Sequence, residues 1–395
     1  MKSASISLLA LAAIALGCAL FAPHAISGNT SESKNDPVSI AVAKAAKWLV
    51  STQGKDGGWG QDGGETSYVR PGERLESNGN DVANTAVAAT ALLRAGSTPT
   101  GGEYQASLLR AVNFILRHVD ESSPDGLEVT TLKGTQIQRK LGPYIDTFLT
   151  SKLLAELDGT MGDARTNAHV RQALQKCVAK IEKNQLKDGS WNIAGGWAPI
   201  LGTSMASRSL YMAKEKGVAV SPVAMDKVQR YTAQTVQVGP TTGEGTGGGS
   251  GRGVAGGVAG GAIGGSYAAS AGVRLYQDAQ ALEQMSRTDK DRRQNAAQIK
   301  AMTGQLSDNR YVMGFGSFGG EEFFSYLNIS DSLRRTGGPA WEKWNGDMKT
   351  KLVKLQNEDG TWAGHHCITG RVAVTSAAIL TMLVDRESIA SAKKN

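Results

Sequence analysis

The sequence predicts an all-α protein in which six helical hairpins close into an α/α toroid. Three observations lead to this fold class: a short motif that recurs at helix ends, a regular alternation of two kinds of helix, and a scarcity of strand patterns. The chain has 395 residues, of which 40% are apolar, so it is long enough to build one large domain with a sizeable core.

The recurring motif is Q-x-x-D-G-x-W. Its three copies are Gln53–Trp59, Gln185–Trp191 and Gln356–Trp362, and each follows a stretch with apolar residues at helical spacing. Asp-Gly supplies a turn, because glycine adopts a positive φ without strain and Asp bonds its own backbone. We therefore expect each Trp to fold back on the helix that has just ended, with the Gln bonding loose backbone groups there.

Two kinds of helix alternate along the chain. Six segments rich in Ala, Gly, Ser and Thr begin near residues 80, 143, 197, 265, 321 and 366, and six more charged amphipathic segments begin upstream of them, near residues 38, 103, 167, 222, 288 and 341. Small residues let helix backbones approach closely, so the first kind suits a tight inner ring and the second an outer layer.

The N-terminus reads as an export signal. An apolar run from about Ile6 to Ala22 is short for a membrane span, and small residues precede a cleavage point after Ser27. A lipoprotein-type cleavage before Cys18 is the alternative, and only then do we expect membrane association. We predict a periplasmic or extracellular protein, organised as a signal peptide (1–27), a linker (28–37), a toroid domain (38–387) and a tail (388–395).

The remaining bulk properties exclude two classes of protein and predict one loop. The formal net charge is +7 without any basic block, so no nucleic-acid partner is expected. Only Cys177 and Cys367 remain after the signal, which leaves no visible disulfide framework. More than half of residues 239–265 are glycine, which predicts a mobile surface loop within the fourth hairpin.

The repeats resemble the prenyltransferase and squalene oxidase repeat of squalene-hopene cyclases, oxidosqualene cyclases and protein prenyltransferase β subunits. The resemblance covers most of the chain after residue 37, and it implies a toroid with a central cavity for an apolar ligand, with an isoprenoid as the favoured class. The D-x-D-D acid motif of those cyclases does not occur here, nor does a D-D-x-x-D motif. Standard terpene cyclisation is therefore not predicted.

Protein prenyltransferases offer a second comparison, because they hold a catalytic zinc with Asp, Cys and His from the starts of late inner helices. The corresponding stretches here are "GGEEFFSYL", with Glu321 and Glu322, and "GHHCITG", with His365, His366 and Cys367. No residue-by-residue match carries over, so zinc is a hypothesis that the resemblance suggests.

These five residues form the sharpest chemical candidate. Imidazole and thiolate are good zinc ligands, but neighbours in sequence rarely close a site alone, so a carboxylate from another segment has to join them. We predict His365, His366 and Cys367 as metal ligands, with Glu321, Glu322 and both histidines as catalytic candidates. The alternative is that the Glu residues favour a helix N-terminus and the histidines bond a turn.

Further candidates lie near the starts of the inner helices. Asp146 and Arg371 fall inside helices, where an unpaired buried charge is costly, and both are therefore catalytic candidates. The predicted cavity-lining residues are Asp81, Tyr144, Trp197, Ser204, Tyr267 and Tyr326, with Asp81 also interpreted as a helix cap.

Three functions stay open at this point. The first is an enzyme acting on an apolar isoprenoid ligand, with the segment from Glu321 to Cys367 at its centre. The second is a non-catalytic binding or scaffold toroid, as in complement-type thioester domains, with an envelope component as partner. The third is a polysaccharide lyase or glycosidase on the same fold.

Overall fold

The computed structural model describes residues 36–61, 79–192, 199–237, 271–312 and 319–386, and these residues form α-helices. The only extended pairings among them are two isolated bridges, Trp59 with Asp81 and Thr98 with Gly101. The all-α fold class is confirmed. The predicted signal peptide, most of the linker, the glycine-rich stretch 239–265 and the tail lie outside the described residues.

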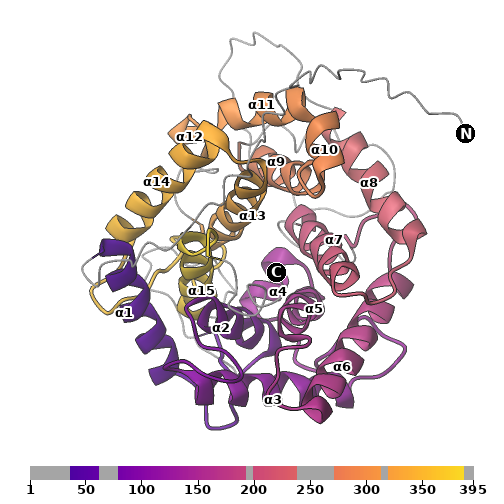
Figure 1. Ribbon diagram of the computed structural model, residues 1–395, viewed down its shortest axis with the longest axis vertical. Helices are drawn as coiled ribbons and strands as arrows, with labels where there is room; N and C mark the ends of the chain where they lie inside the picture. Colours follow the sequence, from indigo (N-terminus) through magenta and orange to yellow (C-terminus); the bar gives the residue numbers. More distant parts are fainter. Residues whose placement is uncertain (1–35, 62–78, 193–198, 238–270, 313–318, 387–395) are drawn as a thin grey trace, which may run out of the picture.

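Six helices form a closed inner ring (Figure 1). Each contacts the next in chain order, and the last returns to the first. They are α2 (Val82–Arg94), α5 (Ile145–Leu157), α7 (Pro199–Glu215), α9 (Ala271–Met285), α13 (Gly320–Thr336) and α15 (Arg371–Met382).

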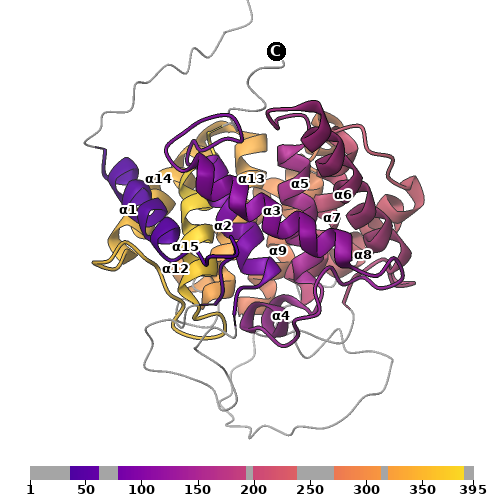
Figure 2. The same cartoon turned by 90° about the horizontal axis from the view of Figure 1, so that it is seen from below.

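A second layer of helices surrounds this ring, as Figures 1 and 2 show. The outer helices pack against the inner helix that precedes or follows them in the chain; α3 packs on α2, for example, and α8 on α9. The first outer helix also contacts the last, α14, which closes the outer layer. The outer helices are α1 (Pro37–Ser51), α3 (Gln105–Glu121), α6 (Ala164–Lys183), α8 (Pro222–Gln237), α10 (Asp289–Gln294), α11 (Ala296–Gln305) and α14 (Gly338–Leu355).

The composition of each helix explains its layer. In the inner helix α2, both faces are buried, and five of its thirteen residues are alanines that let neighbouring backbones approach. In the outer helix α3, Leu108, Ala111, Ile115 and Val119 recur at helical spacing and are buried, while Arg110, Asn113 and Arg117 on the other face are exposed. The predicted division into inner and outer helices is confirmed.

Local signals start several of these helices. Asp36 and Asp163 cap α1 and α6 by accepting the Ser39 and Thr166 amides at 2.9 and 2.8 Å. Pro37 occupies the first turn of α1, where a missing amide proton costs nothing.

Each copy of Q-x-x-D-G-x-W closes a tight turn after an outer helix. In the first copy the Asp56 carboxylate accepts the Gly58 amide at 3.0 Å, and Gly57 has a φ of +94°. A Cβ on Gly57 would lie 2.5 Å from the Arg110 carbonyl oxygen of α3, so glycine is required both for its conformation and for the close approach. Gly189 and Gly360 repeat this conformation in the other two copies.

The three tryptophans of the motif are buried and hold the helix that precedes them. Each indole N–H donates to a carbonyl in the last turn of that helix, with distances of 2.7 Å to Leu49, 2.7 Å to Ile181 and 2.8 Å to Leu352. Their own backbone amides donate to a threonine hydroxyl of the following inner helix, Thr85, Thr203 and Thr375. Each tryptophan therefore joins an outer helix to its inner partner.

The glutamines of the motif connect neighbouring hairpins. Gln53 donates to the Ser107 carbonyl in α3, Gln185 to Ala224 in α8, and Gln356 to Ala41 in α1, at 2.9, 2.9 and 2.8 Å. The third bond joins segments 315 residues apart and closes the circle. The predicted role of the motif is confirmed, and the contact with the next hairpin is an addition that the sequence did not show.

The structure differs from the predicted helix pattern in three places. The last inner helix begins at Arg371, about one turn later than expected, because residues 365–370 form a loop. The fifth outer segment breaks at Asn295 into α10 and α11. Two short helices were not predicted, α12 (Asn309–Val312) and α4 (Gln136–Leu141), which lies at one end of the barrel in Figure 2.

None of the described helices combines the length and apolarity that a membrane-spanning helix requires.

Replacing Trp362 by Phe tests the hydrogen bond between the indole N–H and the Leu352 carbonyl. The variant keeps an aromatic ring but leaves the buried Leu352 carbonyl without its donor, so we expect the free energy of unfolding to fall by about 1–3 kcal/mol. Denaturant unfolding measures this loss. Trp341→Phe is the matched control, since that partly buried indole makes no hydrogen bond to the described residues; equal losses in the two variants would contradict the role of the indole N–H.

Candidate active and metal-binding site

The N-terminal ends of the inner helices gather at one end of the barrel. The start of α5 contacts the start of α2, because the Asp146 carboxylate accepts the Ala83 amide at 3.1 Å. The start of α13 contacts the loop before α15, because the Gly320 amide donates to the His366 carbonyl at 3.3 Å. Residues far apart in sequence therefore meet at this end, which we call the N-terminal rim.

Two glycine contacts bring α13 and the loop 364–370 together. A Cβ on Gly320 would lie 2.0 Å from the Ile368 carbonyl oxygen, and a Cβ on Gly364 would lie 2.1 Å from the same atom. Neither position has room for a side chain, so the two backbones touch directly. This contact places the first turn of α13 beside the side chains of the loop.

Cys367 is the one non-glycine residue with a positive φ, 61°, in the described part of the chain. Such a conformation is uncommon for a residue with a side chain and is often found at functional sites. The thiol is buried, and its sulfur lies 3.2 Å from Nδ1 of His366. The strained turn thus directs two neighbouring side chains toward one point.

Glu321 joins these two residues from the first turn of α13. Its Oε1 lies 3.7 Å from Nδ1 of His366, and its side chain is fully buried. One ligand atom each from Glu321, His366 and Cys367 lies within 4.8 Å of the others. The predicted meeting of a carboxylate with the histidine–cysteine pair therefore occurs in the structure.

The carboxyl groups of Glu321 and Glu322 have raised pKa values. Burial raises the pKa of Glu321, and burial together with the charge of Glu321 raises the pKa of Glu322 well above its usual value. The Tyr276 hydroxyl, from α9, donates to Glu322 at 3.2 Å. A side-chain hydrogen bond with Cys367 and the charge of His366 favour the ionised form of Glu321, whereas one oxygen of Glu322 is buried without a hydrogen-bond partner. The helix N-terminus offers both carboxylates partial compensation.

This donor set fits a divalent metal ion of the zinc type. Ligands at about 2.0–2.3 Å in a tetrahedron lie roughly 3.3–3.7 Å from one another. The measured separations of 3.7 Å from Glu321 to His366 and 3.2 Å from His366 to Cys367 are close to those edges. An ion would also compensate the negative charge of the fully buried Glu321 carboxylate.

Two of the predicted members lie elsewhere. His365 is exposed, and its ring is not among the converging ligand atoms. Arg371 bonds Asp359 at 2.9 Å and covers the Trp48 ring at 5.3 Å, so it packs toward the outer layer. We therefore remove His365 from the ligand set and Arg371 from the catalytic candidates.

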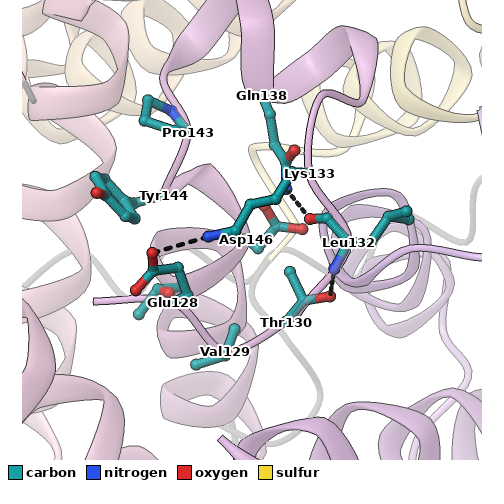
Figure 3. A pocket seen from close by; sticks show the side chains of 10 residues that line it. Glu128, Val129, Thr130, Leu132, Lys133, Gln138, Pro143, Tyr144 and Asp146 are labelled. Atoms are coloured by element: carbon teal, nitrogen blue, oxygen red, sulfur yellow. Dashed lines mark hydrogen bonds and ion pairs between the residues drawn. The ribbon is translucent and has the colours of Figure 1, made fainter. Parts of the chain in front are cut away.

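Asp146 forms a different part of the rim. Its second oxygen accepts Gln138 of α4 at 2.7 Å, so both oxygens are engaged and the residue fastens α2, α4 and α5 together. The hydrogen bonds of this carboxylate account for its burial inside a helix. Figure 3 shows Asp146 among the side chains around a recess that has no room for a water molecule. Asp146 thus has a structural role in a site without room for a ligand.

The predicted cavity-lining residues have varied positions. Asp81 is the N-cap of α2 and accepts the Asn84 amide at 2.8 Å, as its interpretation as a cap predicted. Tyr144 precedes α5 and borders the recess of Figure 3. Ser204 is buried and lies 3.4 Å from the Asn328 amide, which brings α7 and α13 together across the ring.

Tyr326 is placed differently from the prediction. Its ring packs 6.4 Å from that of Trp344 in the outer helix α14, and its hydroxyl donates to the Val312 carbonyl at 3.0 Å. The side chain therefore lies between the two layers, where an aromatic residue fills the hairpin interior. Trp197 and Tyr267 lie outside the described residues.

Sequence reasoning missed Tyr276, the partner of Glu322, and a group of charged residues at the opposite end of the ring. That group includes Lys152, Arg208 and Asp331, in the inner helices α5, α7 and α13. An ionisable residue in the middle of an otherwise Ala-, Ser- and Thr-rich inner helix is the pattern that could have revealed it.

Residues 23–128 match the family model of the squalene-hopene cyclase C-terminal domain. The predicted family resemblance is confirmed. The match takes in the first hairpin and the outer helix α3 of the second, less than half of the chain. In a separate comparison of structures, the type II terpene cyclase MstE from Scytonema, solved with its substrate geranylgeranyl dihydroxybenzoate, aligns at a TM-score of 0.50 with 10% identity. The alignment covers 88% of this chain and 97% of that one, which establishes the shared toroid fold.

A second structure of the Scytonema cyclase aligns over the same shares with 11% identity and a TM-score of 0.35, and it adds nothing to this comparison. No curated protein sequence matches the chain.

The two buried aspartates of the rim predict a pH dependence of stability. Burial, with the charge of Asp146, raises the pKa of Asp81 from 3.8 to about 7, and burial raises that of Asp146 from 3.8 to about 6. Both groups keep their protons longer in the folded state, so their contribution to stability is complete below about pH 4 and is lost as the pH rises through 6 and 7. Each group changes the unfolding free energy by at most about 1.4 kcal/mol per pH unit.

The comparison of wild type with Asp81→Asn isolates this effect. Asn keeps the capping oxygen but does not titrate, so we expect the variant to lose less stability between about pH 4 and pH 7 than the wild type. Denaturant unfolding at a series of pH values measures both slopes. Parallel slopes would show that Asp81 is ionised normally in the folded protein.

Proposed function

We propose that this protein is an exported, squalene-cyclase-like toroid that acts on an apolar ligand of the isoprenoid class at a metal centre formed by Glu321, His366 and Cys367. The observation that carries the proposal is the convergence of these three side chains beside Glu322, one of whose oxygens is buried without a hydrogen-bond partner. A stable protein gains nothing from such a cluster unless something fills it, because unpaired buried carboxylates are costly.

The choice of ligand class is supported by the resemblance and by the fold. Squalene-hopene cyclases and the Scytonema cyclase share the repeat segment or the toroid, and the latter binds an isoprenoid-bearing substrate. We extend that ligand class to this chain. Export and a location outside the cytoplasm belong to the proposal through the N-terminal sequence pattern.

The chain's own residues suggest a division of labour. Glu321, His366 and Cys367 would hold the ion, which supplies Lewis acidity when bound. Burial and the charge of Glu321 raise the pKa of Glu322 beside this group, so Glu322 is the residue of the rim suited to proton transfer, and the Tyr276 hydroxyl orients its carboxylate. The surrounding aromatic and aliphatic side chains exclude water from this end of the ring.

Metal analysis of the full-length protein, purified after native export, tests the proposal. We expect about one zinc ion per chain in the wild type, and a reduction of metal affinity by at least about 100-fold in His366→Ala and in Cys367→Ser. His169→Ala is the control, because that histidine is exposed and pairs only with Asp120 on the surface.

Mass spectrometry of lipids that co-purify with the same variants provides the second readout. We expect an isoprenoid species with the wild type and a changed profile with His366→Ala. A metal-free protein whose ligand profile survives that substitution would instead identify a non-catalytic binding toroid.

A further inference from the structure

A network of charged side chains spans the inside of the ring near the C-terminal ends of the inner helices. Arg208 of α7 pairs with Asp331 of α13 at 3.2 Å, although α9 separates these helices in the ring. Arg94, the last residue of α2, pairs with Glu156 of α5 at 2.9 Å. These side chains therefore reach into the interior of the ring, at the end opposite to the Glu321 cluster.

Cations outnumber carboxylates in this network. Two carboxylates each form ion pairs with three arginines: Asp331 and Glu283. The carboxylates are Glu156, Glu283 and Asp331, and the cations are Arg94, Lys152, Arg208, Arg287, Arg334 and Arg335. The cations still outnumber the carboxylates when the exposed Glu215, which lies near Arg208, is counted as well.

Lys152 is the member without a partner. It lies in the middle of α5 and makes neither a hydrogen bond nor an ion pair with the described residues, yet it experiences the charges of Arg208, Asp331, Glu156 and Glu283. Burial, followed by the charge of Arg208, lowers its pKa. An ammonium group placed in this way is expected to attract an anion.

The network borders space that solvent can enter. The side chains of Arg208, Asp331 and Arg335 retain 15%, 22% and 12% of their exposed surface although they lie inside the ring. Lys152 is also only partly buried. Buried nitrogens without hydrogen-bond partners, Nη1 of Arg208 among them, add donors to the same region.

Helix dipoles account for only some of these cations. A cation in the last turn of a helix compensates the partial negative charge there, and Arg94, Arg334 and Arg335 occupy such positions. The effect fades beyond the last turn, whereas Lys152 and Arg208 lie five and seven residues before the ends of α5 and α7. Those two cations need another explanation.

We propose that the C-terminal end of the toroid interior binds a phosphate-type oxyanion between Lys152 and Arg208. The excess of positive charge suits a multiply charged anion better than a single carboxylate, and arginine presents a planar pair of donors that matches phosphate oxygens. The oxyanion is either free phosphate or the head group of an amphiphile whose chain lies in the ring. The inference does not depend on the metal centre at the N-terminal rim.

Isothermal titration calorimetry of the full-length protein at constant ionic strength tests this site. The probes are inorganic phosphate, decyl phosphate and acetate. We expect saturable binding of a phosphate probe at one site per chain, at least 10-fold weaker binding in Lys152→Met, and retained binding in Lys152→Arg. Lys47→Met is the matched control, because it removes the same charge from the exposed face of α1.

Each outcome decides a different point. Tighter binding of decyl phosphate supports an amphiphile head group, and equal or tighter binding of inorganic phosphate supports a free anion. Absence of saturable binding for both phosphates, equal weakening in Lys152→Met and Lys47→Met, or binding of acetate as tight as that of phosphate overturns the proposal. Metal content is measured in the same samples, so loss of the metal centre is recognised separately.

Discussion

The ring depends on the hydrogen bond between a buried indole N–H and a carbonyl at the end of an outer helix. Helix ends leave carbonyl groups without partners, and a buried carbonyl without a donor is costly. Trp59, Trp191 and Trp362 satisfy one such carbonyl each and at the same time bind the next inner helix through their own amides. The same motif then reaches the following hairpin through its glutamine, so one turn organises three helices.

Closure of this ring determines where the acidic and the basic side chains of the inner helices gather. The inner helices run in the same direction, since starts contact starts at the rim and the charged residues near their ends meet on the other side. Acidic side chains such as Asp81, Asp146 and Glu321 gather at the N-terminal ends, where helix dipoles favour negative charge. The excess of cations gathers at the other end. The toroid thereby has two chemically different openings.

The N-terminal rim contains two kinds of buried carboxylate, one with its hydrogen bonds complete and one without. Asp146 and its neighbours satisfy one another and fasten three helices, whereas Glu321 and Glu322 are adjacent buried carboxylates, and one oxygen of Glu322 has no hydrogen-bond partner. The second group is the better candidate for chemistry, because a stable fold has no use for unsatisfied carboxylates. The D-x-D-D motif of the squalene cyclases is absent from the sequence, and the proposed chemistry rests instead on a pair of glutamates beside a histidine and a cysteine.

The sequence by itself determined the six hairpins, the two helix layers and the turn after each outer helix, because these follow from local periodicity and from residues that are close together in the chain. It also placed Glu321 and the His366–Cys367 pair at the same rim. Tertiary structure decided which candidates meet. The touching glycines and the positive φ of Cys367 separated His366 from His365, packing turned Arg371 and Tyr326 outward, and the pairing of Arg208 with Asp331 across the ring arose between helices that are not neighbours in sequence. Side-chain direction and long-range electrostatics depend on contacts that only ring closure creates.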